Sequence, residues 1–534
     1  MLYVTMQPQP GLSLDQFHEW YNNEHGPTRL RIPRIFPNGL RYEATDGAQP
    51  TFLAIYDVTS MAQLETPTYT SLRANRSPRE AETIGQVTVK RHFLDLILSS
   101  QSPLFLPIEQ LTDAEAAGLV LVSVEVSLQN TEGAEEAVRK WCEEEHIPML
   151  SKVPGWLRSR MYRTSSLEGG AVKLVSLHEY AKTNGLGGPE HKASMSTPWR
   201  TEVFSKYIGN KARRTYSLFY VFGPAPRDLS SLSRLPATAA FTSADGKTST
   251  APEPSAAITS WVTAADGLVI PYRLEGNPSP VAPTVAFCNS LLTSLHMWDP
   301  LVALIKAQRP DLRILRYDTR GRAEMPSPPK PATLEVLADD LAGLLSALRI
   351  PKLHALVGVS MGGATSLRFA MRHPGMVGRF VACDFNAASG AANTTAWKER
   401  IAVAEGQGEG GESGIATLAR ATVGRWFHPQ TMAEKGDVVQ WMTEMVAANT
   451  VEGFKYSCQA LWDYDMKADM GECPVPGLFV VGEADGKGAL VKAMDGFKGN
   501  LGQGGAELKI VPLAGHLPMC ECPREFWEAI RDFL

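Results

Sequence analysis

One serine in this chain stands in a setting that suits nucleophilic chemistry. Residues 358–363 read Gly-Val-Ser-Met-Gly-Gly, and they follow the apolar run His354 to Val359 and open a helical pattern. Glycines on either side of a serine permit the sharp turn from strand to helix that exposes its hydroxyl above a sheet. The alternative is a turn of small residues with an idle serine. The motif makes Ser360 a candidate nucleophile.

A nucleophilic serine needs a base and an orienting carboxylate, because a hydroxyl is a weak nucleophile near neutral pH. In the chain order serine, acid, histidine, the sequence offers Asp485 and His516. Asp485 follows the apolar run 478–481, and His516 follows the run 508–511. Both come at the ends of predicted strands, as Ser360 does. We predict that the three residues form a catalytic triad.

Two other carboxylates, Glu483 and Asp465, compete for the role of the acid. Asp465 lies before the strand 478–481 rather than after it. Glu483 is two residues nearer to that strand than Asp485, where the backbone would still be extended. We therefore keep Asp485 as the acid.

Negative charge that develops on an attacked carbonyl oxygen needs backbone N–H donors. In this motif one donor comes from the residue after the nucleophile, here Met361, and the other from a loop after an early strand. The strand-like run 284–288 leads into Asn289, Ser290 and Leu291. We predict that Leu291 supplies the second donor, and that Asn289 and Ser290 shape the loop.

The elements that must position these residues alternate between strand and helix. Helical patterns separate most of the strand-like runs, which cover residues 284–288, 313–317, 354–359, 379–384, 478–481 and 508–511. Such alternation predicts a mostly parallel sheet with helices on both faces. Residues 387–470 interrupt it with helical patterns and a glycine-rich run at 406–414. We predict that this insertion is a lid over the strand ends, where ligands bind.

At these residues the region 258–534 resembles the α/β-hydrolase family, and within it the 3-oxoadipate enol-lactonase-like group. The resemblance rests on the serine motif and on Asn-Ser-Leu at 289–291, His-Met-Trp-Asp-Pro at 296–300, Tyr-Asp-Thr-Arg-Gly at 317–321, Arg-Trp-Phe at 425–427, Gly-Glu-Ala-Asp at 482–485 and Ala-Gly-His at 514–516. It implies an α/β fold and the hydrolysis of an ester or lactone through an acyl-enzyme. It also makes Trp426, in the predicted lid, a candidate for contact with the substrate.

The chain departs from the family's pattern at one loop. Where such enzymes usually read Arg-Gly-His-Gly, residues 320–323 read Arg-Gly-Arg-Ala. The departure leaves open whether the same acidic lactone is bound. Arg320 is a candidate contact for a substrate carboxylate, and the alternative that we prefer is a salt bridge that supports the loop.

The first part of the chain contains an internal repeat. Its residues recur 121 positions later, so that Trp20, Glu24, His25, Pro27 and Pro33 correspond to Trp141, Glu145, His146, Pro148 and Pro154. Each copy has the order strand, helix, strand, strand, helix, strand, which is that of a ferredoxin-like α+β unit with one bare sheet face. Two such bare faces in one chain can bury each other.

The paired Trp-x-x-x-Glu-His-x-Pro motifs resemble the EthD-like members of the dimeric α/β-barrel superfamily over residues 1–223. The resemblance implies that the two copies form one barrel, and that its interior binds aromatic or polyketide-like molecules. It makes His25 and His146 candidates for substrate binding or proton transfer. The alternative is a histidine at a helix end that is bonded to the backbone, with Pro27 and Pro148 terminating the helices.

Composition describes a globular chain with several domains. Its 534 residues exceed the roughly 100–200 of one domain, and 44% of them are hydrophobic. We predict one ferredoxin-like repeat over 1–110, a second over 111–223, a linker rich in Ser, Pro, Ala and Thr over 224–257, and the hydrolase region over 258–534. A net charge of -5 does not suit a dedicated nucleic-acid binder.

The sequence indicates neither a membrane segment nor a bound cofactor. No apolar run reaches the roughly 20 residues of a membrane span, and the N-terminus lacks the pattern of a secretory signal. Seven scattered cysteines do not suit a disulfide framework, and no His/Cys set or phosphate-binding glycine motif indicates a metal or cofactor. We predict a cytoplasmic protein that takes a small-molecule substrate, and we leave open whether it forms homo-oligomers.

Three functions are compatible with these residues. The first is a serine hydrolase for an ester or lactone of a small, aromatic or polyketide-derived molecule, with the N-terminal barrel as a binding or assembly module. The second uses the same triad for carbon–carbon bond hydrolysis, acyl transfer or cyclisation. The third is a non-catalytic ligand-binding or scaffold protein. Fold-level analogy does not separate them.

Overall fold

The computed structural model describes residues 1–322, 324–408 and 413–534. The chain divides into two compact units, Met1–Pro226 and Arg227–Leu534, and each is described by itself. Ala323, part of the departure from the family's pattern, and residues 409–412, part of the glycine-rich run, lie outside the described residues.

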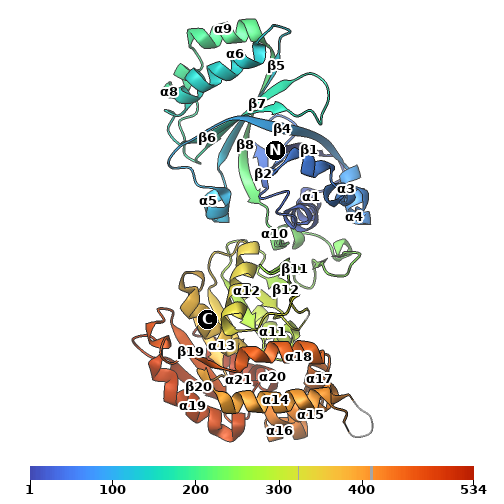
Figure 1. Ribbon diagram of the computed structural model, residues 1–534, viewed down its shortest axis with the longest axis vertical. Helices are drawn as coiled ribbons and strands as arrows, with labels where there is room; N and C mark the ends of the chain where they lie inside the picture. The colour runs from blue at the N-terminus through green and yellow to red at the C-terminus, as the bar shows by residue number, and fades with distance from the viewer. Residues whose placement is uncertain (323, 409–412) are drawn as a thin grey trace. The chain divides into compact units, whose positions relative to one another are not determined.

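The first unit is built on a closed antiparallel barrel of eight strands (Figure 1). Their order around the barrel is β1-β3-β2-β8-β5-β7-β6-β4. The strands span β1 Leu2–Pro8, β2 Leu40–Ala44, β3 Phe52–Tyr56, β4 Val87–Gln101, β5 Val120–Leu128, β6 Trp156–Thr164, β7 Lys173–Tyr180 and β8 Ile208–Val221. The two halves therefore join edge to edge, through β2 with β8 and β4 with β6, and their inner faces share one core inside the barrel.

The repeat in the sequence is visible in the helices of the two halves. The first half carries α1 Leu14–Trp20, α2 Gly26–Leu30, α3 Pro67–Ala74 and α4 Pro78–Gly85; the second carries α5 Asp113–Ala116, α6 Ala134–Trp141, α7 Ile147–Leu150, α8 Pro189–Ser194 and α9 Pro198–Tyr207. In each half the Glu-His motif lies in a five-residue π-helix, Tyr21–His25 or Cys142–His146.

The prediction that Pro27 and Pro148 terminate the motif's helices is wrong. Each π-helix continues into a short α-helix, and each proline stands at the start of that helix. A proline is tolerated there because its missing N–H would have no partner in the first turn. The wider π turn absorbs the change in hydrogen bonding, so the helix runs on through the proline.

Alternating side chains divide the first unit into three hydrophobic cores. On β1, Leu2 and Val4 pack with Trp20 and Tyr21 beneath the helices of the first half. Tyr3 between them points the other way and packs inside the barrel with side chains of both halves. A third core lies beneath the helices of the second half. The barrel interior is thus filled by protein side chains.

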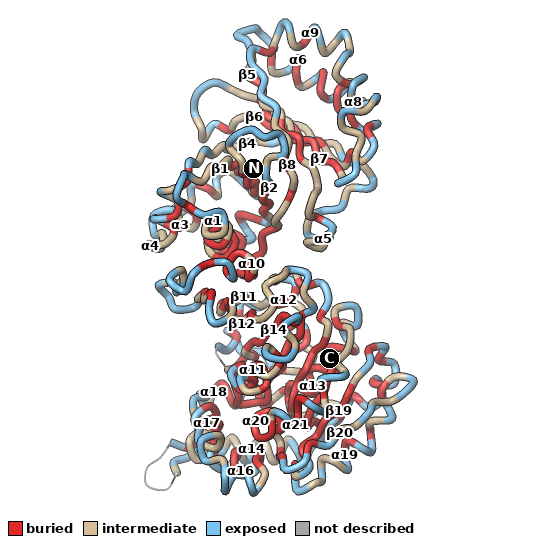
Figure 2. Tube along the Cα trace, turned by 180° about the vertical axis from the view of Figure 1, so that it is seen from behind, coloured by how far each residue is buried: buried red, intermediate tan, exposed pale blue. Residues whose placement is uncertain are grey.

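The second unit contains, in the described part of the chain, a ten-stranded sheet of order β20-β19-β16-β15-β13-β14-β12-β11-β10-β9. Its strands span β9 Phe241–Thr242, β10 Ser249–Ala251, β11 Ala257–Thr263, β12 Val269–Gly276, β13 Thr284–Cys288, β14 Arg313–Tyr317, β15 Ala355–Val359, β16 Phe380–Cys383, β19 Gly477–Gly482 and β20 Glu507–Val511. From β14 to β20 neighbouring strands are parallel, so their carboxyl ends meet at one edge. Figure 2 shows burial concentrated in this sheet and in α13 (Met361–Arg372).

Helices cover the sheet and fill the interval between β16 and β19. Those packed beside the strands are α11 Asp299–Gln308, α12 Leu334–Ala347, α13, α19 Ala489–Phe497, α20 Pro518–Glu521 and α21 Pro523–Ile530. The interval predicted as a lid contains α14 Ala391–Glu405, α15 Gly414–Trp426, α16 Pro429–Glu434, α17 Gly436–Ala447 and α18 Val451–Ser457. A short pairing of Ala388–Ser389 with Tyr464–Asp465 joins the two ends of this interval.

Part of the segment predicted as a linker belongs to the sheet. Within 224–257, β10 pairs with β11 and β9 pairs with β10. The buried Thr248 hydroxyl also shares a hydrogen bond of 2.8 Å with Ser260. Serine and threonine form short strands here at the edge of the sheet. Composition alone does not distinguish such strands from a linker.

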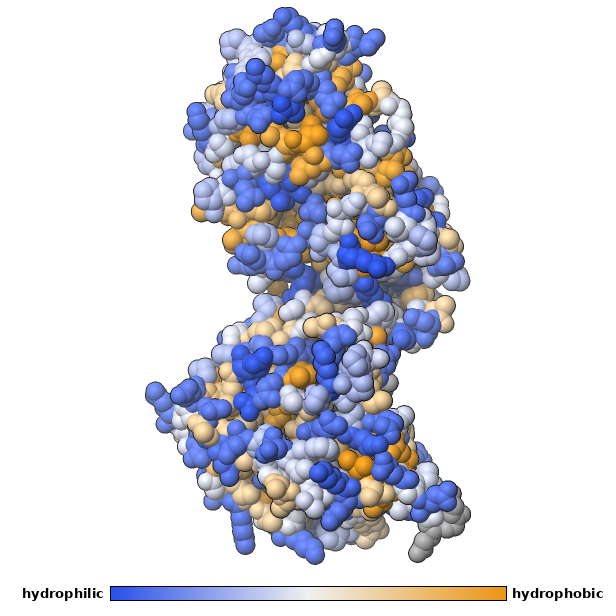
Figure 3. All heavy atoms as spheres, in the orientation of Figure 1, coloured by the Kyte–Doolittle hydropathy of each residue, from blue (hydrophilic) through white to orange (hydrophobic). Residues whose placement is uncertain are grey.

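Polar side chains dominate much of the surface in Figure 3, with apolar side chains in smaller patches. Among the described residues, no helix combines the length and apolar character that crossing a bilayer requires.

Candidate active site

Ser360 stands on a sharp turn between β15 and α13. Its backbone has φ 59° and ψ -118°, which a side chain other than glycine rarely adopts. The turn is tight enough that a Cβ on Gly358 would collide with the Gly362 carbonyl, and one on Gly362 would collide with that of Cys288. Any larger residue at these two positions would therefore clash with the backbone of the turn.

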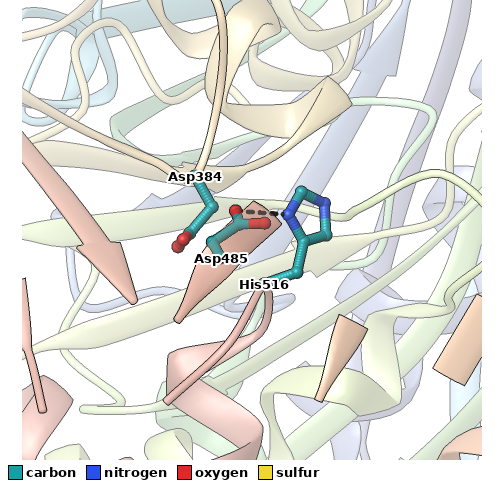
Figure 4. Close-up of side chains that lie close together, drawn as sticks. All are labelled: Asp384, Asp485 and His516. Carbon is teal, nitrogen blue, oxygen red and sulfur yellow. Dashed lines mark hydrogen bonds and ion pairs between the residues drawn. The ribbon is translucent and has the colours of Figure 1, made fainter. Parts of the chain in front are cut away.

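Asp485 and His516 meet at the carboxyl ends of β19 and β20. His516 Nδ1 lies 2.7 Å from Asp485 Oδ2, and Figure 4 shows the carboxylate facing the imidazole. Burial opposes ionisation of Asp485, but His516 and a hydrogen bond from Asp384 hold its pKa below the usual value. The imidazole is thus fixed by an ionised carboxylate, and its Nε2 is left for other partners.

A second carboxyl group, Asp384, lies beside Asp485 (Figure 4). It follows β16 directly, is 1% exposed, and accepts the Gly482 N–H through Oδ1 at 2.8 Å. Its Oδ2 is buried and receives no hydrogen bond from the described residues. Burial and the Asp485 charge raise the pKa of Asp384 well above its usual value. This shift favours the protonated carboxyl, the form that can donate a hydrogen bond to Asp485.

Sequence reasoning missed Asp384. The strand-like run 379–384 ends on this aspartate, so a signal was present: a carboxylate at a carboxyl end, where Ser360 and Asp485 also stand. A carboxylate oxygen of Asp384, a carboxylate oxygen of Asp485 and a ring nitrogen of His516 lie within 4.8 Å of one another. The hydrogen bond between His516 and Asp485 accounts for the approach of that pair.

The loop that carries His516 is tied to the end of α15. His516 N–H donates to the Trp426 carbonyl at 2.6 Å, and the two rings stack with centroids 5.6 Å apart. The buried Glu521 carboxylate accepts the Gly515 N–H at 2.8 Å and the His428 N–H at 2.6 Å. One carboxylate thus fastens the histidine loop to the segment after α15.

Ser360, Asp485 and His516 line one cavity of about 430 Å³, together with Leu291, Leu292 and Trp426. The structure records no hydrogen bond between Ser360 and His516. Catalytic hydrogen bonds are often long in unliganded sites and tighten when substrate binds. Leu292 has φ 69°, so the loop after β13 turns sharply at this wall of the cavity.

Asn289 supports that loop from behind. Its side chain donates to the Tyr317 carbonyl at 2.9 Å and accepts the Trp298 indole N–H at 2.9 Å. Ser290 is likewise buried, at 1% exposure. Both side chains face protein rather than the cavity, which fits the shaping role predicted for them.

Two arginines of the lid interval, Arg400 and Arg425, also line the cavity. Arg400 stacks on Trp397, with its guanidinium carbon 4.3 Å from the ring centroid. Burial and the nearby Arg400 lower the pKa of Arg425 to about 10. Neither arginine has an ion pair among the described residues. Sequence reasoning did not select them, although Arg425 stands in the Arg-Trp-Phe run that it quoted.

Arg320 does not line this cavity. Its guanidinium is held by Asp340 through two bonds of 2.6 Å, by Asp266 at 2.8 Å and by the Tyr456 hydroxyl at 3.2 Å. The structure therefore places Arg320 in the loop-supporting salt bridge that we weighed against substrate contact. Burial alone would lower the pKa of Arg320, but the hydrogen bonds and charges of these partners raise it.

The rival acids have other partners. Glu483 accepts the Leu513 N–H at 3.1 Å and so holds the loop after β20. Asp465 is exposed and accepts the Lys467 N–H at 2.8 Å. Neither is among the residues that line the cavity.

His25 and His146 lie in the first unit, each at the end of its π-helix. His25 Nδ1 bonds the Glu80 carboxylate at 2.7 Å rather than the backbone or its neighbour Glu24. His146 stacks on Trp141 with ring centroids 4.5 Å apart. Burial lowers the pKa of His25 to about 3 and that of His146 to about 4.

Comparison with known proteins identifies relatives of the second unit. The model of the Alpha/beta hydrolase family matches residues 286–529. The chain is 29% identical to 3-oxoadipate enol-lactonase 1 of Acinetobacter baylyi over 225 residues, 42% of this chain and 79% of that protein. It is 28% identical to 3-oxoadipate enol-lactonase 2 of the same bacterium, over 38% of this chain and 72% of that protein. A solved hydrolase from Pseudomonas aeruginosa PA01 is 30% identical, with a TM-score of 0.45, over 52% of this chain and 97% of that one.

The matched residues 286–529 include the serine turn, the Asp485–His516 pair and the lid interval. The relatives share most of their own length with the second unit. Over residues 286–529 this unit is similar to the alpha/beta hydrolase family, and the chain is a hydrolase enzyme.

Proposed function

We propose that the second unit is a serine hydrolase that cleaves an ester or a lactone through an acyl-enzyme. One observation carries the proposal: Ser360, on its positive-φ turn, and the Asp485–His516 pair line the same cavity. The names of two relatives, both enol-lactonases, support the substrate class.

In the proposed mechanism each group has one step. Ser360 Oγ attacks the carbonyl carbon and gives its proton to His516 Nε2, while Asp485 stabilises the imidazolium that forms. The carbonyl electrons move onto oxygen, where the N–H groups of Met361 and Leu291 stabilise the charge. Collapse expels the alcohol, which takes the proton from His516. Water then attacks the acyl-enzyme by the same route and releases the acid.

Replacing the nucleophile tests the proposal directly. Ser360→Ala removes the attacking oxygen, so kcat for 4-nitrophenyl acetate should fall by about 10³-fold or more. Ser346→Ala, at an exposed serine of α12, is the matched control and should keep full activity. Mass spectrometry should also find a fluorophosphonate adduct on Ser360. Full activity of Ser360→Ala, or no adduct, would support the non-catalytic alternative instead.

The two lid arginines suggest which esters bind. Arg400 and Arg425 both line the cavity, and their positive charges repel each other. A substrate carboxylate would reduce this repulsion. The aromatic side chains Trp397, Trp426 and Phe454 line the same cavity and suit an apolar acyl or leaving group. We therefore propose a small ester or lactone that carries a carboxylate.

A pair of substrates that differ in one charge tests this specificity. Arg425→Gln should raise KM for 4-nitrophenyl hydrogen glutarate by about 10-fold, the effect of one charge-assisted hydrogen bond, and leave KM for 4-nitrophenyl butyrate near its original value. Arg420→Gln, at an exposed arginine of the same helix, is the control. Equal effects on both substrates would contradict a carboxylate contact.

The first unit is proposed to be a tandem of two ferredoxin-like units of EthD type. The order strand, helix, strand, strand, helix, strand in each half, and the paired motifs within matching π-helices, support this assignment.

A further inference from the structure

The second half of the N-terminal barrel contains a cavity of about 60 Å³ between its sheet and its helices. Apolar side chains of β5 and α6 form one part of the wall. The titratable groups of the wall are dominated by bases: His146, His178, His191, Arg200, Lys211 and Arg213. No Asp or Glu is among its lining residues.

Matching hydrogen bonds show which residues of the two halves correspond to each other. Ser77 caps α4 by accepting the Glu80 N–H, and Thr197 caps α9 by accepting the Arg200 N–H. Ser77 also donates to Glu24, as Thr197 donates to Glu145, its counterpart in the repeat. Glu80 and Arg200 therefore occupy equivalent positions.

In the first half Glu80 completes the site. His25 Nδ1 bonds Glu80 Oε1 at 2.7 Å, and the cavity there is only about 10 Å³. A protein carboxylate thus bonds the histidine and lies near the positive charge of Arg29. The first half holds its own anion.

In the second half the carboxylate is missing and a cation stands in its place. His146 is 8% exposed, and its Nδ1, the atom equivalent to the one that binds Glu80, is buried without a hydrogen bond from the described residues. Arg200 Nε is also buried without a partner. Glu145 is engaged by Trp141 at 2.9 Å and by Thr197 at 2.6 Å, so it does not serve His146.

The electrostatics of this cavity favour an anion. Burial, Arg200 and Arg213 lower the pKa of Lys211, and burial, Arg200 and Lys211 lower that of His146. These shifts record crowded like charges in a site that partly excludes water. A carboxylate placed among them would pair with the arginines and supply a partner to His146.

We propose that the cavity of the second half binds a small carboxylate with an apolar body, whose carboxylate takes the position that Glu80 occupies in the first half. The apolar body would contact the side chains Val122, Val126 and Leu150. A water molecule needs about 10–15 Å³ of such space, so the cavity suits a short acyl chain or a single ring. The site lies wholly within the first unit and does not depend on the hydrolase chemistry.

Titration calorimetry on the full chain tests the proposal with three probes: butyrate, benzoate and the neutral isostere benzamide. Butyrate or benzoate should bind, and benzamide should bind at least 10-fold more weakly than benzoate. Arg200→Glu restores the arrangement of the first half, so it should fill the site from within and weaken carboxylate binding at least 10-fold. Lys152→Glu makes the same charge change at an exposed residue and should leave binding unchanged.

The hydrolase cavity offers two arginines of its own, so the variants must separate the two sites. Binding that survives Arg200→Glu and is lost in Arg425→Gln would place the carboxylate in the second unit and overturn the proposal. Equal affinity for benzoate and benzamide, or no binding of either carboxylate, would overturn it as well. Circular dichroism checks the fold, and Arg200→Gln replaces Arg200→Glu if the latter does not fold; it should weaken binding in the same direction.

Discussion

The electrostatics of Asp485 depend on a neighbouring carboxyl group, that of Asp384. Asp384 packs its carboxyl against Asp485 in a place where two negative charges would repel strongly. A proton on Asp384, which its raised pKa favours, would replace that repulsion with a hydrogen bond, and Asp485 would stay ionised beside His516. In the proposed mechanism Asp384 is a positioning residue, which acts on the imidazole through Asp485.

This arrangement makes the stability of the second unit sensitive to pH. Because the pKa of Asp384 is raised in the folded state, the unfolded chain loses this proton first as pH rises above about 4. The folded state then binds more protons than the unfolded one, so the contribution of Asp384 to the free energy of unfolding falls with rising pH until its folded pKa is reached.

Asp384→Asn should remove that pH dependence. The amide can still accept the Gly482 N–H and donate to Asp485, without a proton to lose. We expect Tm at pH 7.5 to rise by about 2–4 °C, the shift for ~1 kcal/mol in a large domain, while kcat changes less than threefold. Asp384→Ala, which cannot make either bond, should lower both. A pH series of thermal unfolding for the three proteins checks this; a lower Tm for Asp384→Asn would show that an ionised Asp384 is needed.

At the scale of elements, the site is assembled by loops that are fastened to each other. The His516 loop follows β20, and the Trp426 carbonyl that accepts its N–H comes from the end of α15. Glu521, at the end of α20, bonds both segments through one carboxylate. Movement of the lid interval at this point would therefore move His516, the proposed base.

Glu521→Gln should loosen this fastening. The amide offers one acceptor where the carboxylate offers two, so either the Gly515 or the His428 N–H would lose its partner. The cost is about 1–3 kcal/mol in the free energy of unfolding, and kcat should fall because His516 is held less firmly. Glu525→Gln, on α21, is the comparison and should alter neither quantity. Urea unfolding and ester kinetics measure both; an unchanged kcat would mean that Trp426 alone positions the loop.

How far the sequence predicts these elements depends on the range of the interactions. Local patterns predict the serine turn, the order of strands and helices, and the positions of Asp485 and His516. They suffice there because glycines and apolar runs determine the conformation of the few residues around them. The partner of His25 could not be predicted in this way, because Glu80 is 55 residues away and belongs to another helix. The proton on Asp384 depends on burial, which spacing alone does not reveal.

At the scale of the whole molecule, the boundary between the two units differs from the predicted domain start at residue 258. The second compact unit begins at Arg227, because β9 and β10 extend the sheet beyond β11. The sequence suggested a linker there, since short polar strands at an edge have little apolar periodicity.

Two fragments should therefore behave differently. Residues 227–534 contain every residue that lines the hydrolase cavity, and this fragment should keep kcat within about twofold of the full chain. Residues 258–534 lack β9, β10 and the Thr248–Ser260 hydrogen bond, so Tm should be lower by at least ~2 °C for each kcal/mol lost. Calorimetry and ester kinetics on both fragments test this. Equal Tm values would mean that the edge strands add no stability.

The duplication within the first unit has a further consequence. In a symmetric homodimer every substitution appears twice, so an arginine that replaced a pocket carboxylate would alter both pockets at once. In two copies joined in one chain, a substitution can alter one pocket and leave the other unchanged. The first half can keep Glu80 as the partner of His25, while the second half can change independently and use its cavity to bind a ligand.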